Sequence, residues 1–288
     1  MGEWDSWIGR EERKHDRVDA ELIARWCAVL DRPAPASDHV PQGLHWCLCV
    51  PGAPTASLGE DGHPRRDDSA SGFLPPVPLP RRMWAGSKVE FTGQIAPDAT
   101  IERISRVASI KAKAGASGAL VFVEVEHETL ADGALAVREV QSLVYREASP
   151  AGAALVPPPP GDAAFDRSAW DSTRTLIPSE ALLFRYSALT FNSHRIHYDL
   201  PYARDVEGYR ALVVHGPLIA TLLLDLVRRE LGELALATFS FRAVSPAMCG
   251  EPLNLAMRRE ESGLILAAFA QDGRQVMDAA ATRRSFKL

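Results

Sequence analysis

An apolar run over residues 218–226 constrains the fold of this chain more than any other feature. Its residues are apolar on nearly every face, so a helix formed here has to be buried all round rather than lie on a surface. Gly216 and Pro217 precede the run, and proline is favoured at the first helical position because no N–H partner is lost there. We therefore expect a helix from residue 217 to about 231, ended by Gly232, inside a sheet that covers most of its sides.

Strand patterns occur in both halves of the chain and follow a similar outline. An Asp-Gly pair closes one hairpin in each half, at Asp132-Gly133 and at Asp272-Gly273. This weak internal symmetry is what a duplicated domain leaves. The fold class that we predict is α+β, with two antiparallel sheets each wrapped around a central helix. The expected strands are residues 45–50, 87–94, 100–111, 118–128, 134–146, 181–188, 235–244, 253–259, 264–270 and 275–284, and a further helix capped by Asp19 covers residues 19–30.

The length and the distribution of proline predict two domains and a linker. A chain of 288 residues fits two domains of about 150 residues each. Residues 148–164 contain four consecutive prolines from Pro157 and predict a stiff linker, with domains over residues 1–147 and 165–288. Residues 33–80 are rich in Pro, Gly, Ser and Asp, and a loop of this length is usually functional or partly mobile. We expect the charged run 63–68, which starts at His63, to be solvated.

Composition excludes several classes of function. A net charge of −5 argues against a nucleic-acid partner. No uninterrupted apolar run reaches 18 residues, and the start of the chain lacks the basic-then-apolar pattern of a signal peptide. The four cysteines show no paired zinc spacing, so we expect free thiols in a reducing compartment. The expectation is a cytoplasmic protein with no membrane partner, for which a homodimer stays open.

A cluster of polar residues directly precedes the apolar helix and is the best candidate for a chemical site. Asn192, His194, His197 and Asp199 fall within eight positions. Histidine exchanges protons near neutral pH, as general acid–base catalysis requires. The free N–H groups at the N-terminus of the following helix can hydrogen-bond a developing negative charge. Neither a Gly-x-Gly-x-x-Gly loop nor a Gly-x-Ser-x-Gly elbow is present, which disfavours nucleotide-driven and serine-hydrolase chemistry.

Two segments carry a resemblance to a known family. Asn192-Ser-His-Arg-Ile-His197 and Val214-His-Gly-Pro-Leu218 resemble the motifs of the MaoC-like, hydratase-2 group of hotdog-fold acyl-thioester hydratases and dehydratases. The segment from Gly72 to Gly86 is similar to the branch that contains mesaconyl-C4-CoA hydratase, itaconyl-CoA hydratase and type 2 hydroxyacyl-thioester dehydratase. The resemblance implies a double hotdog, with a groove-forming FAS1-like first half and the active residues in the second half.

The same resemblance implies a hydro-lyase that acts on an enoyl-CoA thioester. The implied substrate is a branched C5 dicarboxyl-CoA, such as mesaconyl-C4-CoA or itaconyl-CoA, with a citramalyl-CoA-type product. CoA is part of the substrate, and neither a cofactor nor a metal is expected. Three alternatives stay open: a 3-hydroxyacyl-thioester dehydratase of fatty-acid or polyketide synthesis, a non-catalytic acyl-CoA-binding hotdog protein, and a hotdog thioesterase.

The resemblance assigns catalytic roles to three positions. His197 occupies the place of the family's catalytic histidine. Asn192 stands where the family usually has an aspartate; an amide cannot exchange a proton usefully, but it can orient a water or a carbonyl. The Gly216 N–H is expected to hydrogen-bond the thioester oxygen, and a side chain there would hinder the approach of the carbonyl. Asp199 is the nearest substitute acid, on the side of His197 if the segment is extended, and a cap or turn residue otherwise.

Further residues are expected to bind substrate. His194 and His197 lack a third metal ligand at a usual spacing, so they are not expected to hold zinc. The Arg195 guanidinium suits a free substrate carboxylate, although a surface role is equally open. His194, Tyr198 and Tyr202 are candidates to line the same pocket, and His215 is expected to shape the turn into the helix. The candidates for a CoA groove are Arg81, Arg82, Trp84, Lys88 and Arg242.

Overall fold

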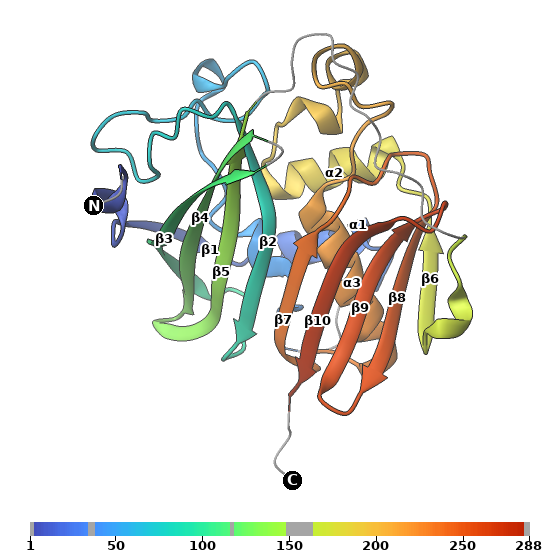
Figure 1. Ribbon diagram of the computed structural model, residues 1–288. Coiled ribbons are helices and arrows are strands. Elements are labelled where there is room, and N and C mark those ends of the chain that lie inside the picture. The colour runs from blue at the N-terminus through green and yellow to red at the C-terminus, as the bar shows by residue number, and fades with distance from the viewer. Residues whose placement is uncertain (1–2, 34–37, 116–117, 148–163, 285–288) are drawn as a thin grey trace.

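Ten strands form one antiparallel sheet in the described part of the chain (Figure 1). The computed structural model describes residues 3–33, 38–115, 118–147 and 164–284. The strand order is β1-β3-β4-β5-β2-β7-β10-β9-β8-β6, and every neighbouring pair is antiparallel. The strands are β1 Glu11–Arg17, β2 Arg81–Phe91, β3 Thr100–Gly115, β4 Gly118–Ala131, β5 Ala134–Arg146, β6 Ser172–Leu176, β7 Leu236–Ala243, β8 Leu253–Glu260, β9 Gly263–Ala270 and β10 Gln275–Arg283.

The strand order contains the repeat that the sequence predicts. The first half runs β1-β3-β4-β5-β2, and the second half read from its own edge runs β6-β8-β9-β10-β7. The predicted Asp-Gly turns join the equivalent hairpins β4–β5 and β9–β10, and Asp132 and Gly133 both have positive φ, at 49° and 82°. Strands β2 and β7 pair at the seam, with Gly86 opposite Arg242. Two hotdog sheets are thus merged into one.

Three α-helices lie on the concave side of the sheet (Figure 1): α1 Ala20–Val29, α2 Glu180–Thr190 and α3 Gly216–Leu231. Asp19 caps α1 as predicted, with its carboxylate accepting from the Leu22 N–H. Helix α3 begins one residue before the predicted start, ends at Gly232 with φ 91°, and buries every side chain from Leu218 to Val227. It packs against β8, β9 and β10 of its own half. Among the described residues between α1 and β2, the longest helical piece is the 3-10 turn Leu44–Cys47, so only the second half keeps a long central helix.

Two predicted strands are helical. Residues 181–188 belong to α2, because Ser179 caps the helix through the Leu182 N–H at 3.2 Å and Glu180 follows in the first turn. Residues 45–50 fall in and after the turn Leu44–Cys47, which starts from Gly43 at φ 99°. Strands β1 and β6 were not predicted. Both form edges of the sheet, and β1 carries charges throughout, which is how sheet edges resist pairing with other chains.

One hydrophobic core extends across the seam between the halves. Trp46 of the first half packs edge-on against Trp84 and against Phe241 of β7, with ring centroids 6.1 and 5.7 Å apart. A Cβ on Gly43 would approach Leu224 of α3 to 2.9 Å, so the first half also packs directly on the central helix.

All four cysteines are free and buried. In the described ranges, no helix is both long and apolar enough to cross a membrane. The predicted linker lies outside the described residues except for its last position.

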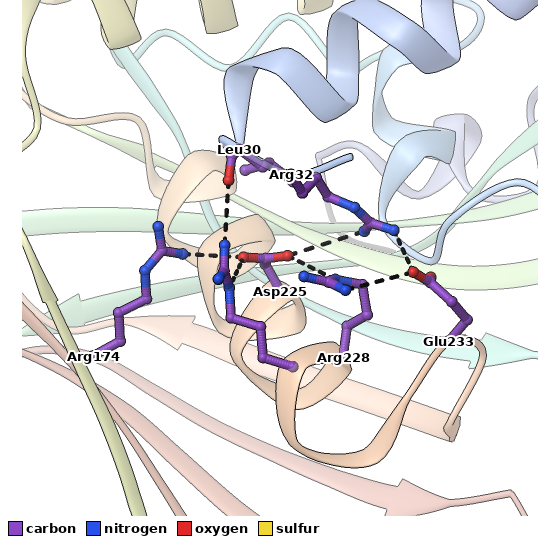
Figure 2. A network of polar contacts seen from close by, with 7 residues as sticks. Leu30, Arg32, Arg174, Asp225, Arg228 and Glu233 are labelled. Atoms are coloured by element: carbon purple, nitrogen blue, oxygen red, sulfur yellow. Dashed lines mark hydrogen bonds and ion pairs between the residues drawn. The ribbon is translucent and has the colours of Figure 1, made fainter. Parts of the chain in front are cut away.

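A buried carboxylate fixes the C-terminal part of α3 (Figure 2). Asp225 is fully buried and accepts ion pairs at 2.7 to 3.0 Å from Arg229, Arg228 and Arg174. Arg32, which follows α1, lies 4.0 Å from the same carboxylate and also pairs with Glu233. Because Arg174 belongs to β6, this cluster ties the central helix both to the edge of the sheet and to the first half of the chain.

Candidate active site

His197 is the best-placed base of the described residues. It ends the 3-10 turn Arg195–His197, and its Nδ1 donates a hydrogen bond to the Val213 carbonyl at 2.7 Å. That bond requires the proton on Nδ1 and leaves the Nε2 lone pair free to accept one. Burial lowers the pKa of His197 to about 4, against the opposing effect of the Val213 bond, so the ring is neutral at physiological pH. The geometry supplies a proton acceptor held in one tautomer.

His215 holds His197 at the start of α3. The two rings stack with centroids 3.5 Å apart, and His215 is the residue that directly precedes the helix. Its Nε2 lies 2.8 Å from the Ser187 Oγ of α2, and burial keeps its pKa well below the ordinary value. Its buried Nδ1 has no partner among the described residues. His215 thus connects α2, the imidazole of His197 and the N-terminus of α3, as its predicted turn-shaping role requires.

Gly216 opens α3 beside this stack. Its φ is not positive, and a Cβ built on it would meet no atom within 4 Å. Neither backbone strain nor packing therefore requires glycine here. His215 makes no side-chain cap to this helix start, and no hydrogen bond of the Gly216 N–H occurs in the described structure. A free N–H next to open space is what a thioester oxygen needs from this position.

The side chain of Asn192 already forms one hydrogen bond with the local backbone. It follows Phe191, which ends α2 at φ 48°, and its Oδ1 accepts from the His194 N–H at 3.0 Å. The amide NH₂ is therefore the part of the side chain most open to a substrate or a water.

Asp199 and Arg195 bind each other. The Arg195 Nε and Nη2 donate to Asp199 Oδ2 at 2.9 and 2.7 Å, while Asp199 Oδ1 accepts from the Tyr202 N–H. The Tyr202 and Arg195 hydrogen bonds lower the pKa of Asp199, and the segment is helical rather than extended. This arrangement favours the cap role over the acid role. Arg195 also stacks 4.2 Å from the Tyr202 ring centroid, and Tyr198 is half exposed.

The predicted CoA-groove residues lie in separate places. Arg81 forms a half-buried ion pair with Glu207 at 2.9 Å, and Trp84 belongs to the aromatic seam. Arg242 and Lys88 alternate with the inward-facing Phe241 and Ser87, so they lie on the outer face of the sheet. Arg242 is 66% exposed and lies 3.6 Å from Asp278. Arg82 of β2 lies directly opposite Tyr145 of β5 in the strand register. The five predicted residues of this groove do not converge.

A loop of the first half reaches the site. Its His63 is only partly exposed, whereas Arg65, Asp67 and Asp68 of the charged run are exposed, as predicted. The Ser193 Oγ donates to the Gly62 carbonyl at 2.5 Å, and the Arg195 N–H donates to the Asp61 carbonyl at 2.8 Å. A Cβ on Gly62 would lie 2.0 Å from the backbone carbonyl oxygen of Ser193, so only glycine allows this approach. The loop brings the His63 ring to 4.1 Å from His194. The sequence signal that was available is the length of the loop over residues 33–80.

Hydrogen bonds join Asp61 to His63 within this loop. The His63 Nδ1 lies 3.0 Å from Asp61 Oδ2, and the His63 backbone N–H donates to Asp61 Oδ1. Burial alone would raise the pKa of Asp61, but the bonds and charge of His63 outweigh it and lower the pKa to about 2. Donor atoms of Asp61, His63 and His194 lie within 4.8 Å of one another. Both Asp61 oxygens already accept from His63, so we treat the group as a hydrogen-bonded pair beside a histidine rather than as a ligand set.

Comparison with solved structures gives the same fold. HtdX of Mycobacterium tuberculosis aligns with a TM-score of 0.67 at 16% identity, covering 96% of this chain and all of that one. A MaoC-like dehydratase from Phytophthora capsici aligns with a TM-score of 0.67 at 14% identity, covering 96% and 97%. A second M. tuberculosis protein, described as a double hotdog, aligns with a TM-score of 0.57 at 15% identity, covering 97% and 96%. The predicted double hotdog is thus confirmed.

Comparison of sequences is more specific. The mesaconyl-C(4)-CoA hydratase of Chloroflexus aurantiacus is 39% identical over 283 residues, which cover 96% of each chain. The mitochondrial hydroxyacyl-thioester dehydratase type 2 of Schizosaccharomyces pombe is 37% identical over 97 residues, a third of each chain. The family model for hydroxyacyl-thioester dehydratase type 2 matches residues 43–249, which include the His63 loop and every residue of the histidine cluster. This chain belongs to the hydroxyacyl-thioester dehydratase type 2 family.

Proposed function

We propose that this protein adds water to the double bond of an enoyl-CoA thioester and catalyses the reverse dehydration. The observation that carries the proposal is the neutral His197, whose Nδ1 bonds the Val213 carbonyl and whose ring stacks on His215, the residue that precedes the N-terminus of α3. His197 takes a proton from the water that attacks the β-carbon. The Gly216 N–H hydrogen-bonds the thioester oxygen as that oxygen gains enolate charge. The Asn192 amide orients the water or the carbonyl.

The substrate class follows from the relative of nearly full length. Its name, mesaconyl-C(4)-CoA hydratase, supports a branched C5 dicarboxyl-CoA here, with a citramalyl-CoA-type product. The second half of the chain carries the active residues, and the first half contributes its loop. CoA enters as part of the substrate, and the scheme uses no cofactor. The cytoplasmic location and a homodimer stay predictions.

The direct test is an assay on a panel of thioesters. We expect loss of the enoyl-thioester absorbance with mesaconyl-C4-CoA and itaconyl-CoA, and slower loss with unbranched CoA substrates of C4 to C16. A thiol reagent run in parallel should detect no released CoA, because hydration leaves the thioester intact. If no member of the panel is consumed, the proposed function is excluded; if free thiol appears, the protein is a thioesterase.

Replacing the base should remove turnover. For His197→Gln we expect kcat to fall by about 10²- to 10⁴-fold, the usual contribution of a general base. Because the base has to be neutral, wild-type kcat should fall as the pH drops through about 4, the pKa that burial gives His197. The exposed His15 of β1 provides the matched control, and His15→Gln should keep wild-type kcat. Unchanged turnover in His197→Gln would remove this residue from the mechanism.

A second candidate is a dehydratase that acts on 3-hydroxyacyl groups bound to a carrier protein. The family match over residues 43–249 supports the dehydratase part of this candidate, because the family is named for a hydroxyacyl-thioester dehydratase. The same catalytic residues would serve it. A preference for long, uncharged acyl groups on a carrier protein over C5 dicarboxyl-CoA would favour this alternative.

A further inference from the structure

We propose that His63, oriented by Asp61, is the general acid of this site and delivers the proton to the α-carbon of the substrate. The inference rests on the proposed hydration and names a residue from the other half of the chain. It explains how a member of the family without an aspartate at position 192 can still move two protons.

Hydration requires a base for the water and an acid for the α-carbon, and the motif itself supplies only the base. Asn192 cannot exchange a proton, and Asp199 is held by Arg195 and the Tyr202 N–H. Burial lowers the pKa of His194 to about 2, so His194 is neutral and holds no proton to deliver from an imidazolium. Among the described residues of the cluster, His63 is the one imidazole with a carboxylate partner.

The loop geometry holds His63 in position. Three hydrogen bonds fasten residues 60–62 to the motif: the Gly62 carbonyl accepts from Ser193, and the Asp61 and Glu60 carbonyls accept from Arg195. The His63 ring then lies 4.1 Å from His194, whose ring meets His197 edge-on at 5.5 Å. His63 also acts electrostatically on His197, whose pKa it helps to lower. The three rings therefore border one site.

The Asp61 carboxylate decides which nitrogen acts. It accepts from Nδ1, so an imidazolium of His63 presents its second proton on Nε2. This is the arrangement in which a carboxylate fixes the orientation of a catalytic histidine. Asp61 is therefore a positioning residue, and His63 is the catalytic one.

The proton balance closes over one turnover. The water oxygen bonds to the β-carbon, and the water proton passes to His197 Nε2. The π electron pair moves onto the α-carbon through the enolate and takes the proton from His63 Nε2. His197 has then gained one proton and His63 has lost one. The His63 side chain is 30% exposed, so solvent can restore its proton, and His197 releases its own before the next substrate binds.

The pH dependence follows from the same roles. A general acid has to carry its proton, so the kcat profile should fall on the alkaline side, while the base sets the acidic side. The titratable groups that act on His63 come from its own loop and from the motif: Asp61 bonds its Nδ1, the His194 ring lies 4.1 Å away, and His197 interacts with it electrostatically.

The test compares His63→Gln and Asp61→Asn with the control His15→Gln on the thioester that the wild type hydrates fastest. For His63→Gln we expect kcat to fall about 100-fold or more with little change in KM, and the alkaline fall of the kcat profile to disappear. For Asp61→Asn we expect a smaller loss of kcat with a displaced alkaline limb. Circular dichroism and thermal melts confirm that the variants are folded; if His63→Gln does not fold, His63→Asn replaces it.

Each outcome separates the two proposals. Wild-type hydration with full kcat in His63→Gln overturns the role of His63 and leaves the hydratase assignment intact, whereas no wild-type hydration refutes the proposed function. If His63→Gln instead removed the acidic fall of the kcat profile, His63 would be the base, and this result would also overturn the inference. A stoichiometric metal in the purified wild-type protein, lost in His63→Gln and needed for turnover, would assign Asp61, His63 and His194 to a metal site instead.

Discussion

Gly62 and Gly216 differ in the reason for which a glycine stands there: at Gly62 the reason is structural, whereas at Gly216 we propose a chemical one. At Gly62 the structural reason is evident, because an added Cβ would run into the Ser193 backbone. At Gly216 the backbone conformation is open to any residue and the space beside it is empty of protein atoms. We therefore propose that glycine stands at position 216 because of what enters that space.

Gly216→Ala tests this directly. The free energy of unfolding should stay constant or rise by up to about 1 kcal/mol, because alanine favours a helix over glycine. kcat/KM should nevertheless fall about 10- to 100-fold, because the methyl group occupies the approach of the thioester carbonyl. Thermal melts and thioester kinetics on one preparation check both parts. A variant that loses stability together with activity would show that the glycine is structural.

Single residues differed in how far the sequence predicted them. His197 and Gly216 stand in two separate short segments, 192–197 and 214–218, and the resemblance of these segments to family motifs singled them out. Their nearness was an expectation, and the stack of His197 on His215 now brings the two segments together. The position of His63 depends on a loop that crosses from the other half, and no periodicity records such a contact. The charged residues that follow His63 favoured a solvated surface, and the contact of Gly62 with Ser193 is what brings His63 itself to the motif.

Helix α3 combines an apolar body with a buried charge near its end. Its N-terminal residues border the site, while Asp225 binds three arginines and approaches a fourth (Figure 2). The cluster keeps the helix in register with β6 and with the segment after α1. Since Gly216 belongs to the same helix, the cluster also fixes the place of the N–H that we propose for the reaction.

Asp225→Asn should be strongly destabilising. Removing one partner of a buried ion-pair network leaves uncompensated charges, which costs about 3 to 5 kcal/mol of unfolding free energy. The half-exposed Asp278, 3.6 Å from Arg242, provides the control, and Asp278→Asn should cost less than about 1 kcal/mol. Urea denaturation of both variants measures the difference. Equal, small effects would mean that the arginines find water or other partners.

The elements that the sequence predicted well were those with a clear periodicity of apolar residues. Strand β5 was predicted at its observed bounds, and α1 and α3 were predicted to within a residue or two. Residues 181–188 form a short apolar run that fits either a strand or a helix, and the Ser179-Glu180 cap signal before it was not used. Strand β1, with the sequence Glu-Glu-Arg-Lys-His-Asp-Arg, has no apolar face because it lies at an edge of the sheet.

At the scale of the whole molecule, the two halves share one sheet and the larger of two core clusters, while a smaller cluster lies within the first half. The seam pairs β2 with β7, and buried residues of both halves belong to one continuous cluster. We therefore expect thermal unfolding in a single cooperative transition, with equal calorimetric and van't Hoff enthalpies. Differential scanning calorimetry measures both. Two resolved transitions would show that the halves unfold independently.

The loop over residues 58–64 also limits how such a chain can evolve. The two halves share one strand order, but the second half carries the long helix and the first half carries a segment that packs on the second. Recombination that exchanged one half with that of a distant homologue would separate Gly62 from Ser193, even if both halves folded well. Functional chimaeras should therefore inherit residues 58–64 and 192–195 from the same parent.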